Sequence, residues 1–278
     1  MSVRTIHVAH SPDSDDAFMF YALAQGKIPS EGYEFVHHLH DIETLNQAAR
    51  EGRFEVTAIS IHAYAYVSDR YRLLGSGASM GDGYGPLVVA AKPTKVEQLS
   101  RQRIAVPGPW TSAYLALRLR LPEFEPVHLS FDRIGEAVLR GEVAAGVLIH
   151  EGQLTYAREG LVPVEDLGAW WKDKTGLPLP LGGNAVRRDL EPAVQRDLAR
   201  LVRESVRYAL EHREEALQHA LAYGRGLARD EGNRFVGMYV NEWTLDYGEA
   251  GRRALQLFLD AGYQAGVLDR RVPVEILD

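Results

Sequence analysis

The chain contains no cysteine, and this absence narrows its possible chemistry at once. Disulfide bonds, thiolate nucleophiles and zinc sites with sulfur ligands are all excluded. No apolar run approaches the roughly 20 residues that a transmembrane helix needs. Residues 1–16 also lack the apolar segment and the small-residue cleavage site of a signal peptide. We therefore expect a cytoplasmic protein that does not associate with membranes.

Basic stretches are scarce as well. The formal net charge is -7 at pH 7, and lysine and arginine alternate with aspartate and glutamate as on solvated helix faces. Without a basic stripe, nucleic acid is not an expected partner. What remains is an ordinary globular composition of 278 residues, 46% hydrophobic and 25% charged, long enough for two domains or one large one.

Strand-like and helix-like segments alternate along the chain, which predicts an α/β fold. This order favours parallel strand pairing, with ligand-binding groups at the carboxyl ends of the strands. We expect strands at 4–10, 33–40, 54–61, 87–91, 103–106, 128–131 and 144–149. We expect helices at 17–25, 41–50, 113–121, 133–140, 194–219 and 251–261, and another that begins near residue 61.

Two glycine- and proline-rich segments, 75–86 and 175–183, interrupt this alternation. Both are typical of crossovers between domains, because glycine allows tight or flexible turns. They predict one discontinuous domain of residues 1–91 plus 184–278 and a second domain of residues 92–183. A cleft between the two domains is then the expected place for a ligand.

Several polar side chains stand where predicted strands end or helices begin. His150 follows the apolar segment 144–149, although such a histidine is by itself more often structural than catalytic. Ser60 ends a strand and can either cap the following helix or bind a ligand. Thr111 and Ser112 precede a helix, where hydroxyls and free N–H groups can receive a carboxylate or a polyol; helix capping explains them equally well.

Two other patterns could suggest a metal. The acidic run of residues 13–16 offers carboxylates, but Asp13 or Ser14 as a cap of the next helix explains the run better. His38 and His40 have a spacing that can chelate, yet no third ligand has an obvious place, so solvent-facing strand residues are the better interpretation. We predict no metal site.

Seven segments together resemble the 1,4-dihydroxy-6-naphthoate synthases of the futalosine route to menaquinone. They are SPDSDDAFMFYAL, HDIETLNQAA, ISIHAYAYVSDRY, GYGPLVVA, IAVPGPWTSAYLAL, GEVAAGVLIHEGQLTY and DLGAWWKDKTGLPLPLG. The resemblance implies two α/β domains around a central cleft, in the type II-like fold of periplasmic binding proteins. It also implies a carbon–carbon lyase that converts cyclic dehypoxanthinyl futalosine to 1,4-dihydroxy-6-naphthoate and dihydroxyacetone.

The resemblance further implies site residues. His150 matches the catalytic base, and the substrate-contacting stretch falls on Ala58, Ile59 and Ser60. The paired hydroxyls of the family fall on Thr111 and Ser112. The chain departs from the family in having alanine at position 58, where a lysine can stand, and in having Asp13-Ser14-Asp15 in place of a Cys-Pro-Asn pattern.

This chemistry requires no cofactor. Removal of a proton next to a carbonyl, with carbon–carbon cleavage in the retro-aldol direction, is general-base work, and a neutral histidine with a pKa near 7 suits it. Glu151 is a weak candidate for the group that tunes His150, because consecutive side chains often point apart. The expected partner is a small carboxylate substrate, and the chain is expected to be a monomer or a homodimer.

Two alternatives stay open. A non-catalytic binding protein for a small organic anion would use the same fold, since fold does not fix function. Such a receptor needs no base at a strand end, and it would usually carry an export signal. A chorismate dehydratase of the same route is the other alternative, which the segments TGLPLPLG and LIHEGQLTY disfavour.

Overall fold

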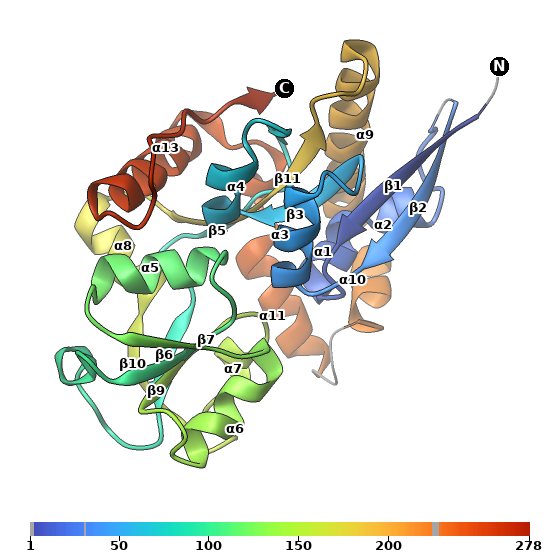
Figure 1. The fold of residues 1–278 in the computed structure, drawn as a ribbon. Coiled ribbons are helices and arrows are strands. Elements are labelled where there is room, and N and C mark those ends of the chain that lie inside the picture. The colour runs from blue at the N-terminus through green and yellow to red at the C-terminus, as the bar shows by residue number, and fades with distance from the viewer. Residues whose placement is uncertain (1–2, 31, 224–227) are drawn as a thin grey trace.

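The computed structural model describes residues 3–30, 32–223 and 228–278, and its strands form two separate sheets. Each sheet is covered by helices, so the α/β fold predicted from the sequence is confirmed. Figure 1 shows the two groups of strands at different heights, with the green helices around the second sheet at the lower left. None of the helices in the described ranges is long and apolar enough to cross a membrane.

The first sheet holds the N-terminal strands in the order β12-β4-β11-β3-β1-β2, with β5 paired to β11. Its strands are β1 (Arg4–His10), β2 (Tyr33–Leu39), β3 (Val56–Ser60), β4 (Tyr71–Leu74), β5 (Ser79–Gly81), β11 (Leu179–Arg187) and β12 (Ile276–Leu277). Its helices are α1 (Ser14–Met19), α2 (Tyr21–Ala24), α3 (Ile42–Arg50), α4 (Ile61–Val67), α9 (Pro192–Glu211), α10 (Arg213–Leu221), α11 (Arg229–Tyr239), α12 (Glu242–Leu245) and α13 (Gly248–Gln264). Strands β1, β2 and β3 are parallel, as their helical connections require.

The second sheet has the order β10-β6-β9-β7-β8. Its strands are β6 (Leu87–Ala90), β7 (Arg103–Val106), β8 (Glu125–His128), β9 (Ala145–Leu148) and β10 (Val162–Asp166). The helical segments around it are the 3₁₀ turns η1 (Val96–Leu99) and η2 (Phe131–Arg133), and the helices α5 (Ser112–Arg120), α6 (Ile134–Leu139), α7 (Gly152–Thr155) and α8 (Leu167–Thr175). Strand β7 lies parallel to both β8 and β9.

The chain passes between the sheets at the two predicted crossovers. Residues 82–86 lead from β5 to β6, and β11 returns the chain to the first sheet after α8. The crossovers touch, because β5 pairs with β11 and places Gly81 opposite Leu179. The predicted first domain, 1–91 plus 184–278, contains β6, which pairs with β9 and β10 in the second sheet.

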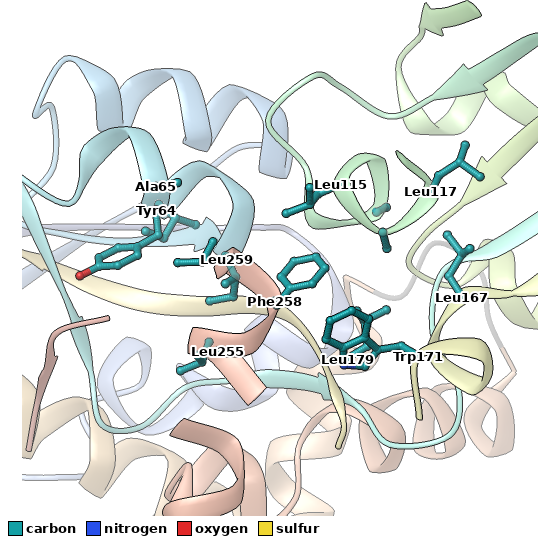
Figure 2. Close-up of a cluster of buried hydrophobic side chains, with 14 of the residues drawn as sticks. Tyr64, Ala65, Leu115, Leu117, Leu167, Trp171, Leu179, Leu255, Phe258 and Leu259 are labelled. Atoms are coloured by element: carbon teal, nitrogen blue, oxygen red, sulfur yellow. The ribbon is translucent and has the colours of Figure 1, made fainter. Parts of the chain in front are cut away.

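A buried apolar cluster joins the two halves of the molecule. It combines side chains of α4 and α13 from the first half with side chains of α5 and α8 from the second. Trp171 belongs to it, 1% exposed, with its ring edge-on to Phe258 at 5.4 Å between centroids (Figure 2). Burial of large apolar side chains is the main stabilising contribution in such a core, so this cluster holds one side of the two halves together.

Three predicted elements differ from the structure. The single helix expected at 17–25 is two helices, α1 and α2, separated at Phe20. The strand expected at 128–131 lies at Glu125–His128, because β8 pairs along the whole of β7, from Arg103 opposite Glu125 to Val106 opposite His128. Its Pro126 is tolerated because β8 is an edge strand. The single helix expected at 194–219 is two helices, α9 and α10, separated at His212, whose backbone φ of -113° and ψ of 46° are not helical.

Candidate active site

A cavity lies where strands of both sheets end, and it brings the predicted site residues together. It encloses about 720 Å³, counting the part of its mouth that is open to solvent, a size suited to a small organic ligand. Six predicted residues line it: Ala58, Ile59, Ser60, Thr111, Ser112 and His150. Their common location is a finding of the structure, whereas their individual roles remain predictions.

Sheet register explains why the cavity forms at this place. Strand β11 runs antiparallel to β3, so Gly182 stands opposite Ser60 and Gly183 opposite Ile59 at the end of β3. Ala58 and Ile59 are buried within β3, with exposures of 6% and 0%. Ala58 has no polar side-chain atom, so any hydrogen bond it makes to a ligand must come from its backbone.

His150 stands two residues beyond β9 in an unusual backbone conformation. Its φ is 55°, in the left-handed region that costs a residue with a Cβ atom about 1 kcal/mol or more. Its Nδ1 lies 2.9 Å from Oδ2 of Asp13, which is 1% exposed. Nδ1 carries the proton in this pair because a carboxylate only accepts, so Nε2 is the nitrogen left for a ligand. Among the described residues, Nε2 has no hydrogen-bond partner.

The charges around His150 set its protonation. Burial by itself lowers the pKa of His150, but the charge and hydrogen bond of Asp13 and the charges of Glu151 and Asp15 outweigh burial and raise the pKa to about 9. The pKa near 7 expected from the sequence is therefore wrong for the ligand-free protein. At neutral pH the ring is an imidazolium paired with Asp13.

Asp13 is the functional residue that sequence reasoning missed. It was expected, together with Ser14, as a helix cap, and it does occupy the N-cap position of α1, but its side chain makes no capping hydrogen bond. The side chain contacts His150 instead, while Ser14 Oγ donates to Glu151 Oε1 at 3.2 Å. An available signal was the position of Asp13 after β1, because β1 and β3 are parallel and their ends share one edge of the sheet.

Two further carboxylates, Asp15 and Asp16, line the cavity beside His150. Burial, followed by the charges of Asp16 and Asp13, raises the pKa of Asp15 well above its usual value. Burial also raises the pKa of Asp16 to about 6, although its Oδ2 accepts a hydrogen bond from the Ser11 N–H at 2.7 Å. Across the described ranges, no group of three or more histidine, aspartate or glutamate side chains is arranged to hold a metal ion.

The Ser60 hydroxyl is held in place with its proton still available. The amide of Asn46 accepts from the Ser60 N–H at 2.9 Å and donates to Ser60 Oγ at 3.0 Å. Ser60 occupies the N-cap position of α4, but its side chain makes no capping hydrogen bond. Because Oγ only accepts in its contact with Asn46, it can donate to a ligand in the cavity.

Thr111 and Ser112 differ from each other. The Thr111 hydroxyl caps α5, accepting from the Tyr114 N–H at 3.3 Å and donating to the Gly108 carbonyl at 2.9 Å. Ser112 Oγ donates to the carbonyl of Leu181 at 2.6 Å and accepts from the His62 N–H at 3.2 Å. With both hydroxyl protons in use, the donors left for a ligand are the backbone N–H groups in the first turn of α5.

Helix α11 and α7 supply cavity residues that the sequence did not indicate. Phe235 and Tyr239 of α11 line the cavity together with Gln153 of α7, whose side-chain amide is hydrogen-bonded to the Tyr239 hydroxyl at 2.7 Å. Burial raises the pKa of Tyr239, so its hydroxyl stays protonated. No local motif marks Phe235 or Tyr239, because only the packing of α11 against the rest of the fold brings them to the cavity.

Comparison with known proteins agrees with this architecture. A family model described as "Menaquinone biosynthesis" matches residues 6–264. Two relatives are named 1,4-dihydroxy-6-naphtoate synthase. The one from Thermus thermophilus is 47% identical over 93% of this chain and 94% of its own length; the one from Streptomyces coelicolor is 36% identical over 96% of each.

Solved structures give the same result for the fold. A crystal structure from Archaeoglobus fulgidus superposes with a TM-score of 0.90 at 50% identity, covering 95% of this chain and 98% of that one. A Candida albicans protein, described as having the generic periplasmic binding protein fold, superposes with a TM-score of 0.71 at 16% identity over 99% and 97% of the two chains. The fold is therefore of the periplasmic binding protein type, and the chain belongs to the menaquinone biosynthesis family.

Proposed function

We propose that the protein is a 1,4-dihydroxy-6-naphthoate synthase, a lyase of menaquinone biosynthesis that releases dihydroxyacetone from cyclic dehypoxanthinyl futalosine. One observation carries the proposal most directly. A buried histidine, oriented by a buried carboxylate and with Nε2 unpartnered among the described residues, lines the ligand-sized cavity. A receptor that performs no chemistry has no need of such a proton-transfer pair.

The carboxylate of the substrate binds at the first turn of α5. No arginine or lysine is among the described residues that line the cavity, so a salt bridge does not supply the attraction. Ser112 and Ala113 precede Leu115, whose N–H makes the first intrahelical hydrogen bond, to the carbonyl of Thr111, so their N–H groups point to the helix start, where the helix dipole favours negative charge. The Ser60 hydroxyl, held by Asn46, adds a side-chain donor to the same cavity.

His150 moves the proton in the chemical step. Neutral His150 accepts a hydroxyl proton of the substrate at Nε2, the carbon–carbon bond next to that hydroxyl breaks, and its electrons pass to the neighbouring carbonyl as an enolate. Asp13 stabilises the imidazolium that results, through the contact at Nδ1. The enolate becomes part of an aromatic ring, which drives cleavage, and it takes a proton to give the naphthol. The carbon that carried the hydroxyl leaves as the carbonyl of dihydroxyacetone.

The two halves of the fold act as two domains that enclose the substrate. Lining residues come from both: Ser60 follows the first sheet, whereas Thr111, Ser112 and His150 follow strands of the second. Closure of such walls excludes water and aligns the breaking bond. The protein acts in the cytoplasm, as a monomer or a homodimer.

Incubation of the purified protein with cyclic dehypoxanthinyl futalosine, without added metal or cofactor, tests this function. Mass spectrometry should detect the naphthoate and dihydroxyacetone in equal amounts. Binding of the substrate without any product would favour a receptor. Dehydration of chorismate in a parallel incubation would instead identify the chorismate dehydratase of the same route.

A further inference from the structure

A second cavity, the aromatic pocket, lies on the other side of the segment that precedes α5. It encloses about 800 Å³, counting space open to solvent, and its lining includes His62, Tyr66, Trp110, Tyr114 and Arg118. Trp110 contributes to this pocket, whereas the next two residues, Thr111 and Ser112, line the catalytic cavity. The aromatic pocket is therefore a separate site.

Its walls suit a flat aromatic ring. The rings of Tyr66 and Trp110 meet edge to face at 4.4 Å between centroids, and Tyr114 lies nearly parallel to His62 at 6.1 Å. Tyr66, Trp110 and Tyr114 are all partly exposed, so their apolar surfaces are not used up by the core. Aromatic side chains in this arrangement offer stacking and edge contacts to a planar ligand.

His62 supplies a buried acceptor at this pocket. The residue is 1% exposed, and its Nδ1 lies 3.2 Å from the carbonyl oxygen of Thr111. A carbonyl only accepts, so Nδ1 carries the proton. Burial lowers the pKa of His62 to about 4, so the ring is neutral at pH 7. Nε2 is then an acceptor, and it has no partner among the described residues. A ligand that satisfies it must donate an O–H or N–H group.

Arg118 supplies a positive charge. Its Nη1 donates to the carbonyl of Pro122 at 2.8 Å, its guanidinium lies over the rings of Tyr114 and Phe124, and within the described ranges no carboxylate forms an ion pair with it. None of the described residues that line the pocket is acidic. A guanidinium with donors to spare favours a carboxylate, with which it can form two parallel hydrogen bonds.

We propose that the aromatic pocket binds a planar hydroxyaryl carboxylate, with the ring against Trp110, the hydroxyl donating to His62 and the carboxylate on Arg118. This is the chemical class of the naphthoate product, and that connection alone rests on the proposed function. The site itself stands on the pocket, the unsatisfied nitrogen and the unpaired guanidinium.

Calorimetry with three stable probes on the wild-type protein tests the proposal without turnover. The probes are 6-hydroxy-2-naphthoate, 2-naphthoate, which lacks the hydroxyl, and 2-naphthol, which lacks the carboxylate. The first should bind about tenfold more tightly than either of the others, since each omission leaves one buried or charged group unmatched. Equal affinities of the three probes would overturn the proposal.

Variants and a crystal structure locate the binding. Arg118→Leu should weaken the two carboxylates about tenfold and leave 2-naphthol unchanged, whereas Arg253→Leu, the same change at an exposed position of α13 outside the pocket, should alter none of them. Should Arg118→Leu fail to fold, crystals of the wild-type protein soaked in 6-hydroxy-2-naphthoate should show the ring against Trp110. Density in the catalytic cavity alone would contradict the proposal, whether or not the protein proves to be a synthase.

Discussion

Two contrasting groups of residues lie in or next to the catalytic cavity. The acidic group surrounds His150 and comprises Asp13, Asp15, Asp16 and Glu151, all buried. The second group, the hydroxyl residues, comprises Ser60, Thr111 and Ser112, which are uncharged and fixed by hydrogen bonds. Under the proposed function, this difference corresponds to a division of labour: the acidic group would control a proton, and the hydroxyl residues with the start of α5 would receive the negative end of the substrate.

Removal of the proton acceptor should have the largest effect. His150→Asn should lower kcat by about a thousandfold, within the range that general-base catalysis contributes. Asparagine tolerates the left-handed backbone at this position, so the variant should fold normally. Product formation is measured by mass spectrometry, and substrate binding by calorimetry. Near-normal turnover, or a loss of binding equal to the loss of turnover, would contradict the assigned role.

The acidic group should be visible in the pH profile. A base in the free enzyme must be neutral, so kcat/KM should rise with pH and level off near pH 9, the pKa of His150. Asp13→Asn removes the strongest influence that raises this pKa, so the rising limb should move to lower pH by about one unit or more. Glu151→Gln is the matched comparison, because Glu151 acts by charge without a hydrogen bond to His150, and its shift should be smaller.

A pH profile of the opposite shape would exchange the roles of acid and base. If kcat/KM falls with the pKa of His150, the imidazolium acts as an acid, and the base lies elsewhere in the cavity. If Asp13→Asn leaves the rising limb of the kcat/KM profile at the same pH, the contact between Asp13 and His150 does not set the pKa of His150.

Substitution among the hydroxyl residues should weaken substrate binding and leave the pH profile unchanged. Ser60→Ala removes one donor to the substrate and should raise KM by about tenfold or more, the value of one hydrogen bond to a charged group. The limb near pH 9 should stay where it is, because Ser60 is not among the groups that shift the pKa of His150. Steady-state kinetics across pH 6–10 measure both KM and the pH at which kcat/KM levels off. A shift of that pH in Ser60→Ala would remove the distinction between the acidic group and the hydroxyl residues.

The smallest effect concerns stability. The pKa of His150 is raised in the folded protein, from 6.5 to about 9. Its contribution to the free energy of unfolding is therefore fully present below pH 6.5 and is lost as the pH rises through 9. Denaturant unfolding of the wild-type protein should show a decline across this window that is weaker in His150→Asn. Parallel curves for the two proteins would show that the pair with Asp13 does not stabilise the fold.

Much of the architecture could be predicted because it follows from local patterns. The strand at 103–106 was placed with its observed bounds, since a short apolar segment followed by a proline- and glycine-rich turn is a local signal. The grouping of Ser60, Thr111, Ser112 and His150 in one cavity was also foreseen, because each follows a strand and the ends of parallel strands converge.

The rest depends on contacts between distant parts of the chain. Asp13 and His150 meet only when the two halves of the fold come together, so the spacing of acidic residues near the N-terminus could not distinguish a helix cap from a partner of His150. The pKa of His150 depends on three carboxylates whose positions the tertiary structure sets. Phe235 and Tyr239 reach the cavity from a helix far along the chain, for the same reason.

The absence of arginine and lysine from the described residues that line the catalytic cavity also bears on how fast the substrate arrives. The protein carries a net charge of -7, and Asp16, whose pKa of about 6 leaves it mostly ionised at pH 7, lies in the cavity itself. An anionic substrate therefore approaches against a repulsive field, which dissolved salt screens over a Debye length of about 8 Å at physiological ionic strength. Association is thus slowest in dilute buffer and quickens as salt is added, the reverse of electrostatic steering, and the short-range donors of Ser60 and α5 act only once the substrate has entered.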